Sequence, residues 1–131
     1  LFYASTHQWP HYPGSGAREE TGMGNIFNEP LAGLSGGKEF KAAYEGRIFP
    51  ALVEFQPDFI FISAGFDAHA DDPLASLRLL EEDYAWVTRR ISEIADTSCA
   101  GRVVSALEGG YNLAALSASV AAHVKSLMEA S

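Results

Sequence analysis

The sequence has a single cysteine, Cys99, among its 131 residues. One cysteine excludes an internal disulfide and a zinc site built from several cysteines, and it is typical of a reducing compartment. We therefore expect a cytoplasmic location. Long hydrophobic runs are also missing, because no apolar stretch reaches the roughly 20 residues of a membrane-spanning helix. No basic and then apolar leader opens the chain, so we expect neither a signal peptide nor a membrane partner.

Positive charge is scarce. Nine Lys and Arg residues stand against 17 Asp and Glu residues, which gives a net charge of −8. Nucleic-acid backbones are bound by clustered basic residues, so we expect no nucleic-acid partner. An acidic surface is compatible with a cationic substrate. Hydrophobic residues make up 47% of the chain, which favours a packed core in a single domain spanning residues 1–131.

Three short apolar runs predict β-strands. They are "LFYAS" (1–5), "FIFIS" (59–63) and "VVSAL" (103–107). Each run is apolar throughout instead of alternating, so we expect strands that are covered on both faces, as in a parallel sheet.

Amphipathic stretches separate these strands and predict helices over 36–57, 81–96 and 113–130. Pro50 lies inside the first pattern and should kink or split it. The alternation of strands and helices indicates an α/β fold with a parallel sheet. Residues 7–36 are rich in Gly and Pro and predict a long loop with a short strand near 25–31, and such a loop is usually functional.

Polar residues and glycines gather directly after each predicted strand, where ligands bind in open parallel sheets. The clusters are "STHQWPHYPGSG", "SAGFDAHADDP" and "EGGYNL". In the second cluster, four side chains are of metal-ligating types: Asp67, His69, Asp71 and Asp72. Carboxylates and imidazoles bind zinc, but Asp residues also make local hydrogen bonds in turns.

For Asp67 these two interpretations stay open. For Asp71 and Asp72, just before a proline, we expect the turn role. His69 is expected to be a second-shell or surface histidine. In "EGGYN", the hydroxyl of Tyr111 could donate to a developing oxyanion. On these residues alone, however, a glycine turn with a half-buried tyrosine is the favoured interpretation.

Taken together, "SAGFDAHADDPL", "LEGGYNL", "HQWPHYPGSG" and "EEDYAWVT" closely resemble the zinc-dependent deacetylase family. That family includes histone deacetylases, acetylpolyamine amidohydrolases and related bacterial enzymes with an arginase-like fold. The resemblance covers nearly the whole chain and is closest to the bacterial, class II-like branch. It implies a three-layer α/β/α architecture and hydrolysis of acetyl-lysine or an acetylated polyamine to an amine and acetate.

The resemblance also implies roles for individual residues. Asp67 matches the family's zinc ligand, and Tyr111 matches the tyrosine that polarises the acetyl carbonyl and stabilises the oxyanion. Ser5 and Thr6 match a strand end that helps to hold a structural monovalent cation in this family, and K⁺ is the ion expected there.

Four further residues correspond to the substrate site. Tyr12 and Leu74 match residues that wall the acyl-lysine tunnel, and Gly109 and Gly110 would flank its floor.

Two motifs of the family are missing. The Asp-x-His pair that supplies the other zinc ligands and the tandem histidines that supply the general base do not occur in this sequence. We do not expect His7, His11 or His69 to replace them. The chain is therefore expected to be the carboxyl-terminal part of a deacetylase domain, and zinc binding by this part alone is not expected. The alternative is a non-catalytic, truncated α/β module that binds a partner or self-associates. In both cases the missing strands should expose an apolar face, and we therefore expect homo-oligomers.

Overall fold

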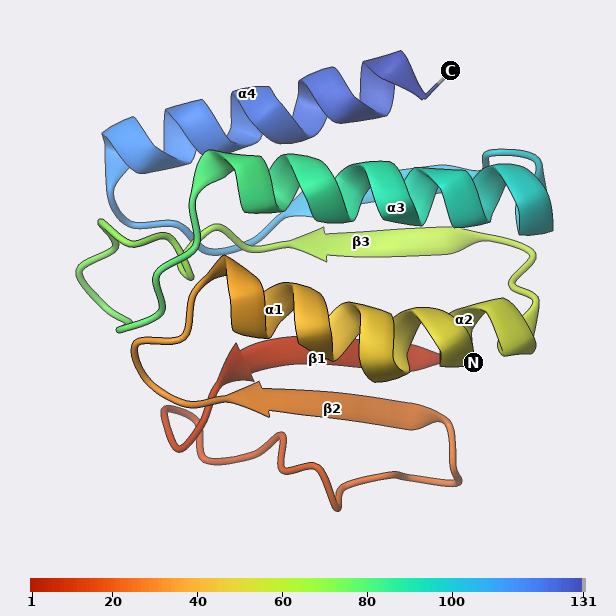
Figure 1. The fold of residues 1–131 in the computed structure, drawn as a ribbon, viewed down its shortest axis with the longest axis horizontal. Helices are drawn as coiled ribbons and strands as arrows, with labels where there is room; N and C mark the ends of the chain where they lie inside the picture. Colours follow the sequence, from red (N-terminus) through yellow and green to blue (C-terminus); the bar gives the residue numbers. More distant parts are fainter. Residues whose placement is uncertain (131) are drawn as a thin grey trace.

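The computed structural model describes residues 1–130 and has an α/β fold in which all strands run parallel (Figure 1). The strands are β1 (Tyr3–Gln8), β2 (Ile26–Leu31), β3 (Ile60–Ala64) and β4 (Val103–Leu107). The helices are α1 (Gly37–Ala43), the π-helix η1 (Tyr44–Ile48), α2 (Phe49–Phe55), α3 (Glu81–Cys99) and α4 (Leu113–Glu129).

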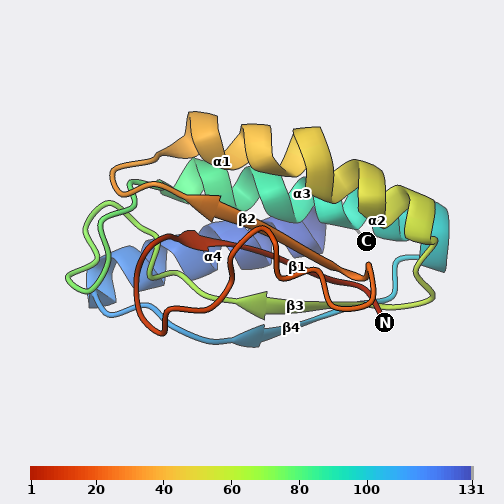
Figure 2. The same cartoon turned by 90° about the horizontal axis from the view of Figure 1, so that it is seen from below.

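The four strands form two parallel pairs. β1 pairs with β2, with Tyr3 opposite Ile26, and β3 pairs with β4, with Ile60 opposite Val103. All four arrowheads point to the same side in Figure 2, so the carboxyl ends of the strands meet at one edge of the molecule. The predicted parallel arrangement is confirmed, although the described strands form two pairs instead of one continuous sheet.

The first predicted helix is divided into three segments. α1 passes into η1, and α2 follows with Pro50 in its first turn. A proline is tolerated there because the amide groups of a first turn have no partner inside their own helix. The backbone stays helical through both junctions, with Ile48 and Phe49 in the right-handed helical region. The expected split at Pro50 is therefore replaced by a change from π-helical to α-helical turns at Phe49, and the π-helical segment is not visible in the hydrophobic pattern.

Helices cover only one face of the described strands, as Figure 2 shows. Along β3 the side chains alternate: Ile60 is buried under the helices, whereas Phe61 is 60% exposed. Val104, opposite Phe61 on β4, is 48% exposed. Successive side chains of a strand point to opposite faces, so a single helical layer can bury only every second residue. The expectation that both faces are covered is wrong for residues 1–130, which form one helical layer and one strand layer.

Two apolar clusters make up the core. One contains Phe40, Phe66, Leu79 and Tyr84 and lies under the loops that follow the strands. The other lies at the opposite end of β3, around Ile60, and includes the buried Cys99 at the end of α3. Burial of each large apolar side chain contributes about 1.5–3 kcal/mol to the stability of the fold, so the first cluster stabilises the loops that pack on it. Within residues 1–130, none of the helices is both long and apolar enough to cross a membrane.

Candidate functional site

The loops that follow β3 and β4 lie side by side at the carboxyl edge of the strands, on the left of Figure 1. The backbone N–H of Phe66 donates to the carbonyl oxygen of Gly109 over 2.8 Å. The N–H of Glu108 donates to the carbonyl oxygen of Ala64 over 2.9 Å. These two bonds continue the strand pairing into the loops, so the segments that carry Asp67 and Tyr111 are held together.

Asp67 and Tyr111 converge on one point above Gly109. A β-carbon added to Gly109 would stand 3.1 Å from Cγ of Asp67 and 3.3 Å from the hydroxyl oxygen of Tyr111. Both distances are shorter than ordinary van der Waals contacts of a β-carbon. Glycine at position 109 therefore leaves room for the carboxylate and the phenol to approach each other.

Tyr111 is placed by a glycine turn on one side and a capped helix on the other. Gly110 has φ +140°, and a β-carbon there would stand 2.7 Å from Cδ1 of Leu116. A side chain at position 110 would thus be strained both in its backbone and in its contacts. After Tyr111, the side chain of Asn112 accepts a hydrogen bond from the N–H of Ala115 and begins α4. The Tyr111 side chain is 54% exposed at this corner.

Asp72 has a larger role than the local one expected from the sequence. One carboxylate oxygen accepts the N–H of Leu74 over 2.9 Å, as expected for an Asp in a turn. The other oxygen accepts the N–H of Tyr111, also over 2.9 Å, and so connects the loop after β3 with the loop after β4. Asp71, in contrast, has a side chain that is 71% exposed.

His69 is buried, and both of its ring nitrogens face other groups of the chain. Nδ1 accepts the N–H of Asp71 over 3.0 Å, which leaves the proton of a neutral ring on Nε2. Nε2 lies 3.3 Å from Oε1 of Glu81 at the start of α3. His69 therefore links the loop to α3 and is not a surface residue.

Ser5 and His7 bond to each other on β1. Nε2 of His7 lies 2.7 Å from the carbonyl oxygen of Gly16 and must donate to it, so Nδ1 accepts from the Ser5 hydroxyl over 2.9 Å. This hydroxyl is therefore committed to His7. Binding of a monovalent cation by Ser5 and Thr6 stays a prediction. β1 also extends to Gln8, so both residues lie within the strand and not beyond its end.

A cavity of about 1070 Å³ opens beside these residues. It is lined by many apolar side chains and by six of the predicted site residues: Ser5, Thr6, Tyr12, Asp67, Gly109 and Tyr111. Leu74 and Gly110 are not part of its lining. Tyr12 and Leu74 are 91% and 59% exposed, and their roles as tunnel walls stay predictions.

Tyr84 on α3 is a residue of this region that the sequence did not single out. Burial, followed by the negative charges of Asp67, Asp72 and Asp83, raises the pKa of its phenol, which stays protonated at neutral pH. Its position on the buried face of an amphipathic helix indicated packing alone, and no local motif marks its closeness to the acidic loop.

A complete metal site is not formed by the part of the chain that the structure describes. No group of three His, Cys, Asp or Glu side chains there could hold a metal ion. Asp67 is one carboxylate, and a catalytic zinc takes three protein ligands. The described residues therefore do not fit zinc by themselves, in agreement with the missing Asp-x-His motif.

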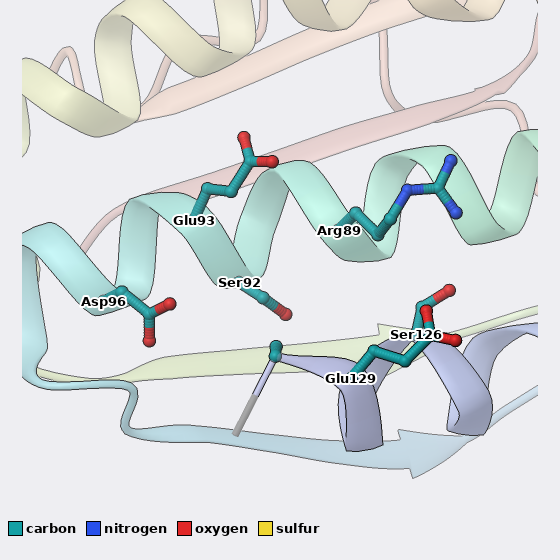
Figure 3. Close-up of a pocket in the computed structure, with 7 residues that line it drawn as sticks. Arg89, Ser92, Glu93, Asp96, Ser126 and Glu129 are labelled. Carbon is teal, nitrogen blue, oxygen red and sulfur yellow. The ribbon is translucent and has the colours of Figure 1, made fainter.

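A second, smaller pocket of about 180 Å³ lies between α3 and α4 (Figure 3). Its rim carries the charged side chains Arg89, Glu93, Asp96 and Glu129. The buried hydroxyls of Ser92 and Ser126 donate to carbonyl oxygens of their own helices. With these hydroxyls already satisfied, the pocket offers no buried polar group for a ligand.

The chain is similar to known proteins over nearly its whole length. The sequence profile of the Histone deacetylase domain family matches residues 1–127. "Histone deacetylase 10, chloroplastic" of Oryza sativa subsp. japonica is 46% identical over 125 residues, which cover 92% of this chain and 28% of that protein. "Histone deacetylase 14, chloroplastic" of Arabidopsis thaliana is 42% identical over 132 residues, which cover 98% of this chain and 31% of that protein.

The fold is shared as well. The crystal structure of the HDA15 HD domain superposes with a TM-score of 0.90 at 36% identity, covering 98% of this chain and 37% of that one. The chain thus spans about a third of the length of each of these three proteins. Because the family profile extends over all but the last four residues, the chain belongs to the histone deacetylase domain family.

Proposed function

We propose that this chain contributes Asp67 and Tyr111 to the active site of a zinc-dependent deacetylase. The observation that carries the proposal is the convergence of the Asp67 carboxylate and the Tyr111 hydroxyl on the space that Gly109 leaves open. Asp67 would supply one zinc ligand, and the remaining ligands and the general base would come from outside the described residues.

The phenol of Tyr111 gives this chain its proposed role in the reaction. Hydrolysis of an acetyl amide adds water to the carbonyl carbon and places negative charge on its oxygen. The Tyr111 hydroxyl is a fixed donor beside Asp67, and its hydrogen bond to that oxygen strengthens as the charge develops. Collapse of the intermediate breaks the C–N bond and yields acetate and a free amine.

The proposed substrate is an acetylated amine, either acetyl-lysine in a protein or an acetylated polyamine. The similar proteins from rice and Arabidopsis carry the name histone deacetylase, which supports this class. A net charge of −8 is compatible with substrates that are cationic near the acetyl group. We also propose a reducing, cytoplasmic compartment, since the one cysteine is free and buried.

Zinc binding and acetate release test the proposal in the complete native protein. We expect one zinc per chain by calorimetry and hydrolysis of an acetyl-lysine peptide. Asp67→Ala should lose both, whereas Asp71→Ala, which removes an exposed carboxylate four residues away, should keep both. Zinc affinity and hydrolysis that are unchanged in Asp67→Ala would overturn the assignment.

A non-catalytic module that self-associates is the second candidate. The exposed Phe61 and Val104 on the open strand face support it, as does the absence of a three-ligand cluster among residues 1–130. Large exposed apolar patches are typical of association surfaces. Unchanged acetylated peptide after incubation with the zinc-loaded native protein would favour this candidate.

A further inference from the structure

The carboxylate of Asp72 joins two loops that are far apart in the sequence. Asp72 is 7% exposed, and each of its two oxygens accepts one backbone N–H over 2.9 Å. One donor is Leu74, two residues away, and the other is Tyr111, 39 residues away. Both donors belong to residues that the sequence predicts to be part of the site.

The second of these bonds is not needed to form the local turn. An Asp turn is closed by one oxygen, here the one that accepts the N–H of Leu74. A buried carboxylate is costly unless its oxygens are hydrogen-bonded, and bonds from backbone N–H groups to an ionised acceptor are short and strong. The bond to Tyr111 therefore satisfies the remaining oxygen and fixes the distance between the two loops at the same time.

The backbone of Tyr111 has few other restraints on its amino-terminal side. Gly110 precedes it at φ +140°, a region that glycine reaches easily and leaves easily. On the other side, Asn112 caps α4 and is held by the helix. The bond from the Tyr111 N–H to Asp72 adds to the bond between Phe66 and Gly109 and acts on Tyr111 itself, next to the side chain whose direction matters.

We propose that Asp72 is a positioning residue, whose buried carboxylate holds the backbone of Tyr111 and Leu74 at a fixed place relative to Asp67. This inference rests on the proposed function for its effect on catalysis, whereas the connection between the loops can be measured without it. Asp72 does not touch the reacting atoms and acts through Tyr111.

Asp72→Asn and Asp71→Asn form a matched pair in the complete native protein. Each removes one negative charge, but only Asp72 is buried and bonded to Tyr111. Asparagine has one acceptor oxygen for the two N–H donors, so the amide of Tyr111 or that of Leu74 loses its partner. Amide hydrogen exchange at one of these two residues should become about tenfold faster in Asp72→Asn and stay unchanged at both in Asp71→Asn. We further expect kcat on an acetyl-lysine peptide to fall by about 10- to 100-fold with little change in KM, because a misplaced group costs rate more than binding.

A backbone ester at position 111 tests the bond without touching Asp72. Replacing the Tyr111 N–H by an ester oxygen keeps the phenol but removes the donor to Asp72. It should lower kcat as Asp72→Asn does, which also covers the case in which Asp72→Asn folds poorly. In a Tyr111→Phe background, Asp72→Asn should have little further effect on kcat, because the group that it positions is already gone.

Two results would overturn the inference. One is unchanged exchange of both the Leu74 and the Tyr111 amides in Asp72→Asn, and the other is an equal loss of kcat from Asp72→Asn with and without the Tyr111 hydroxyl. If the native protein released no acetate, the proposed function would fail, and the exchange measurement alone would still decide whether Asp72 holds Tyr111.

Discussion

The Nδ1 atom of His123 lies 2.7 Å from the hydroxyl oxygen of Thr88, and this contact joins α4 to α3. On the other side of the ring, Nε2 lies 2.8 Å from the hydroxyl of Ser105 on β4. The imidazole is 6% exposed and packs edge-on against Phe66. The histidine thus joins two helices and a strand through hydroxyl groups, with no charged side chain among these contacts.

Stability should fall as the pH drops below about 6.5, because burial lowers the pKa of His123. The unfolded chain takes up a proton at the ordinary pKa, before the folded chain does, so acid favours unfolding over this range. The stabilising effect is present above that pKa and is lost as the pH falls toward the lowered one. Chemical unfolding at about pH 7 and about pH 5 measures it.

His123→Gln is the control for this pH dependence, since glutamine keeps a polar side chain and does not titrate. The difference in unfolding free energy between the two pH values should be smaller in His123→Gln than in the parent chain. Equal pH dependence in both chains would show that other groups, such as carboxylates, account for all of it.

Tyr111→Phe should remove deacetylation while leaving the fold intact. The change deletes one oxygen atom from a side chain that is 54% exposed, and the bond from its backbone to Asp72 remains. Loss of a single oxyanion donor typically lowers kcat about 100-fold or more. Turnover of an acetyl-lysine peptide measures this effect, and the circular dichroism spectrum provides the control. A variant with the parent's kcat would exclude Tyr111 as the oxyanion donor.

Gly109→Ala should impair the site through space alone. The new methyl group would stand 3.1 Å from Cγ of Asp67 and 3.3 Å from the Tyr111 hydroxyl, so one or both must move. We expect zinc affinity and kcat to fall together. Gly46→Ala is a suitable comparison, because a β-carbon at position 46 in η1 meets nothing within 4 Å. That variant should be fully active and more stable by about 0.5–1 kcal/mol.

Glu29→Gln should destabilise the fold, because Glu29 is a buried carboxylate between two arginines. Its oxygens accept hydrogen bonds from Arg18 in the loop between β1 and β2 and, over 3.0 Å, from Arg47 in η1. Removing the charge should cost about 1–3 kcal/mol in urea unfolding. Glu45→Gln removes an exposed ion pair, in which Oε1 of Glu45 lies 3.4 Å from Nη1 of Arg90. This change should cost about 0.5 kcal/mol or less. Similar losses in both variants would contradict this ranking.

Phe61→Lys should reduce self-association of the 131-residue chain. Phe61 is 60% exposed on the open strand face, where a charge opposes burial against a second copy. In size-exclusion chromatography the parent chain should elute as an oligomer and Phe61→Lys closer to a monomer. Val53→Lys adds the same charge at an exposed apolar position of α2 and should leave the oligomer unchanged. A compact monomer of the parent chain at high concentration would refute the prediction.

Several features of the fold could be predicted from local patterns. The strand over 103–107 follows from a short apolar run, and the change of helix type at Phe49, next to Pro50, lies where proline stereochemistry predicts an irregularity. The amphipathic pattern over 81–96 predicts most of α3, which continues to Cys99. These patterns depend on residues that are close in the sequence, so they can be recognised before the fold is known.

The candidate site was partly predictable for the same reason. Asp67 and Tyr111 each directly follow a strand, and parallel strands bring their carboxyl ends to one edge. Tyr84 and the cross-loop bond of Asp72 were not predictable, because each depends on a neighbour that no spacing in the sequence reveals.

By itself, the sequence determined the element types, their parallel order and the edge at which polar residues collect. Only the tertiary structure decided which strand face is covered, that Asp72 holds Tyr111 and that Thr88 holds His123. Periodicity and turn chemistry act over a few residues, so they can be seen in the sequence. Contacts between distant residues depend on how whole elements pack, and many pairings are compatible with one and the same local pattern.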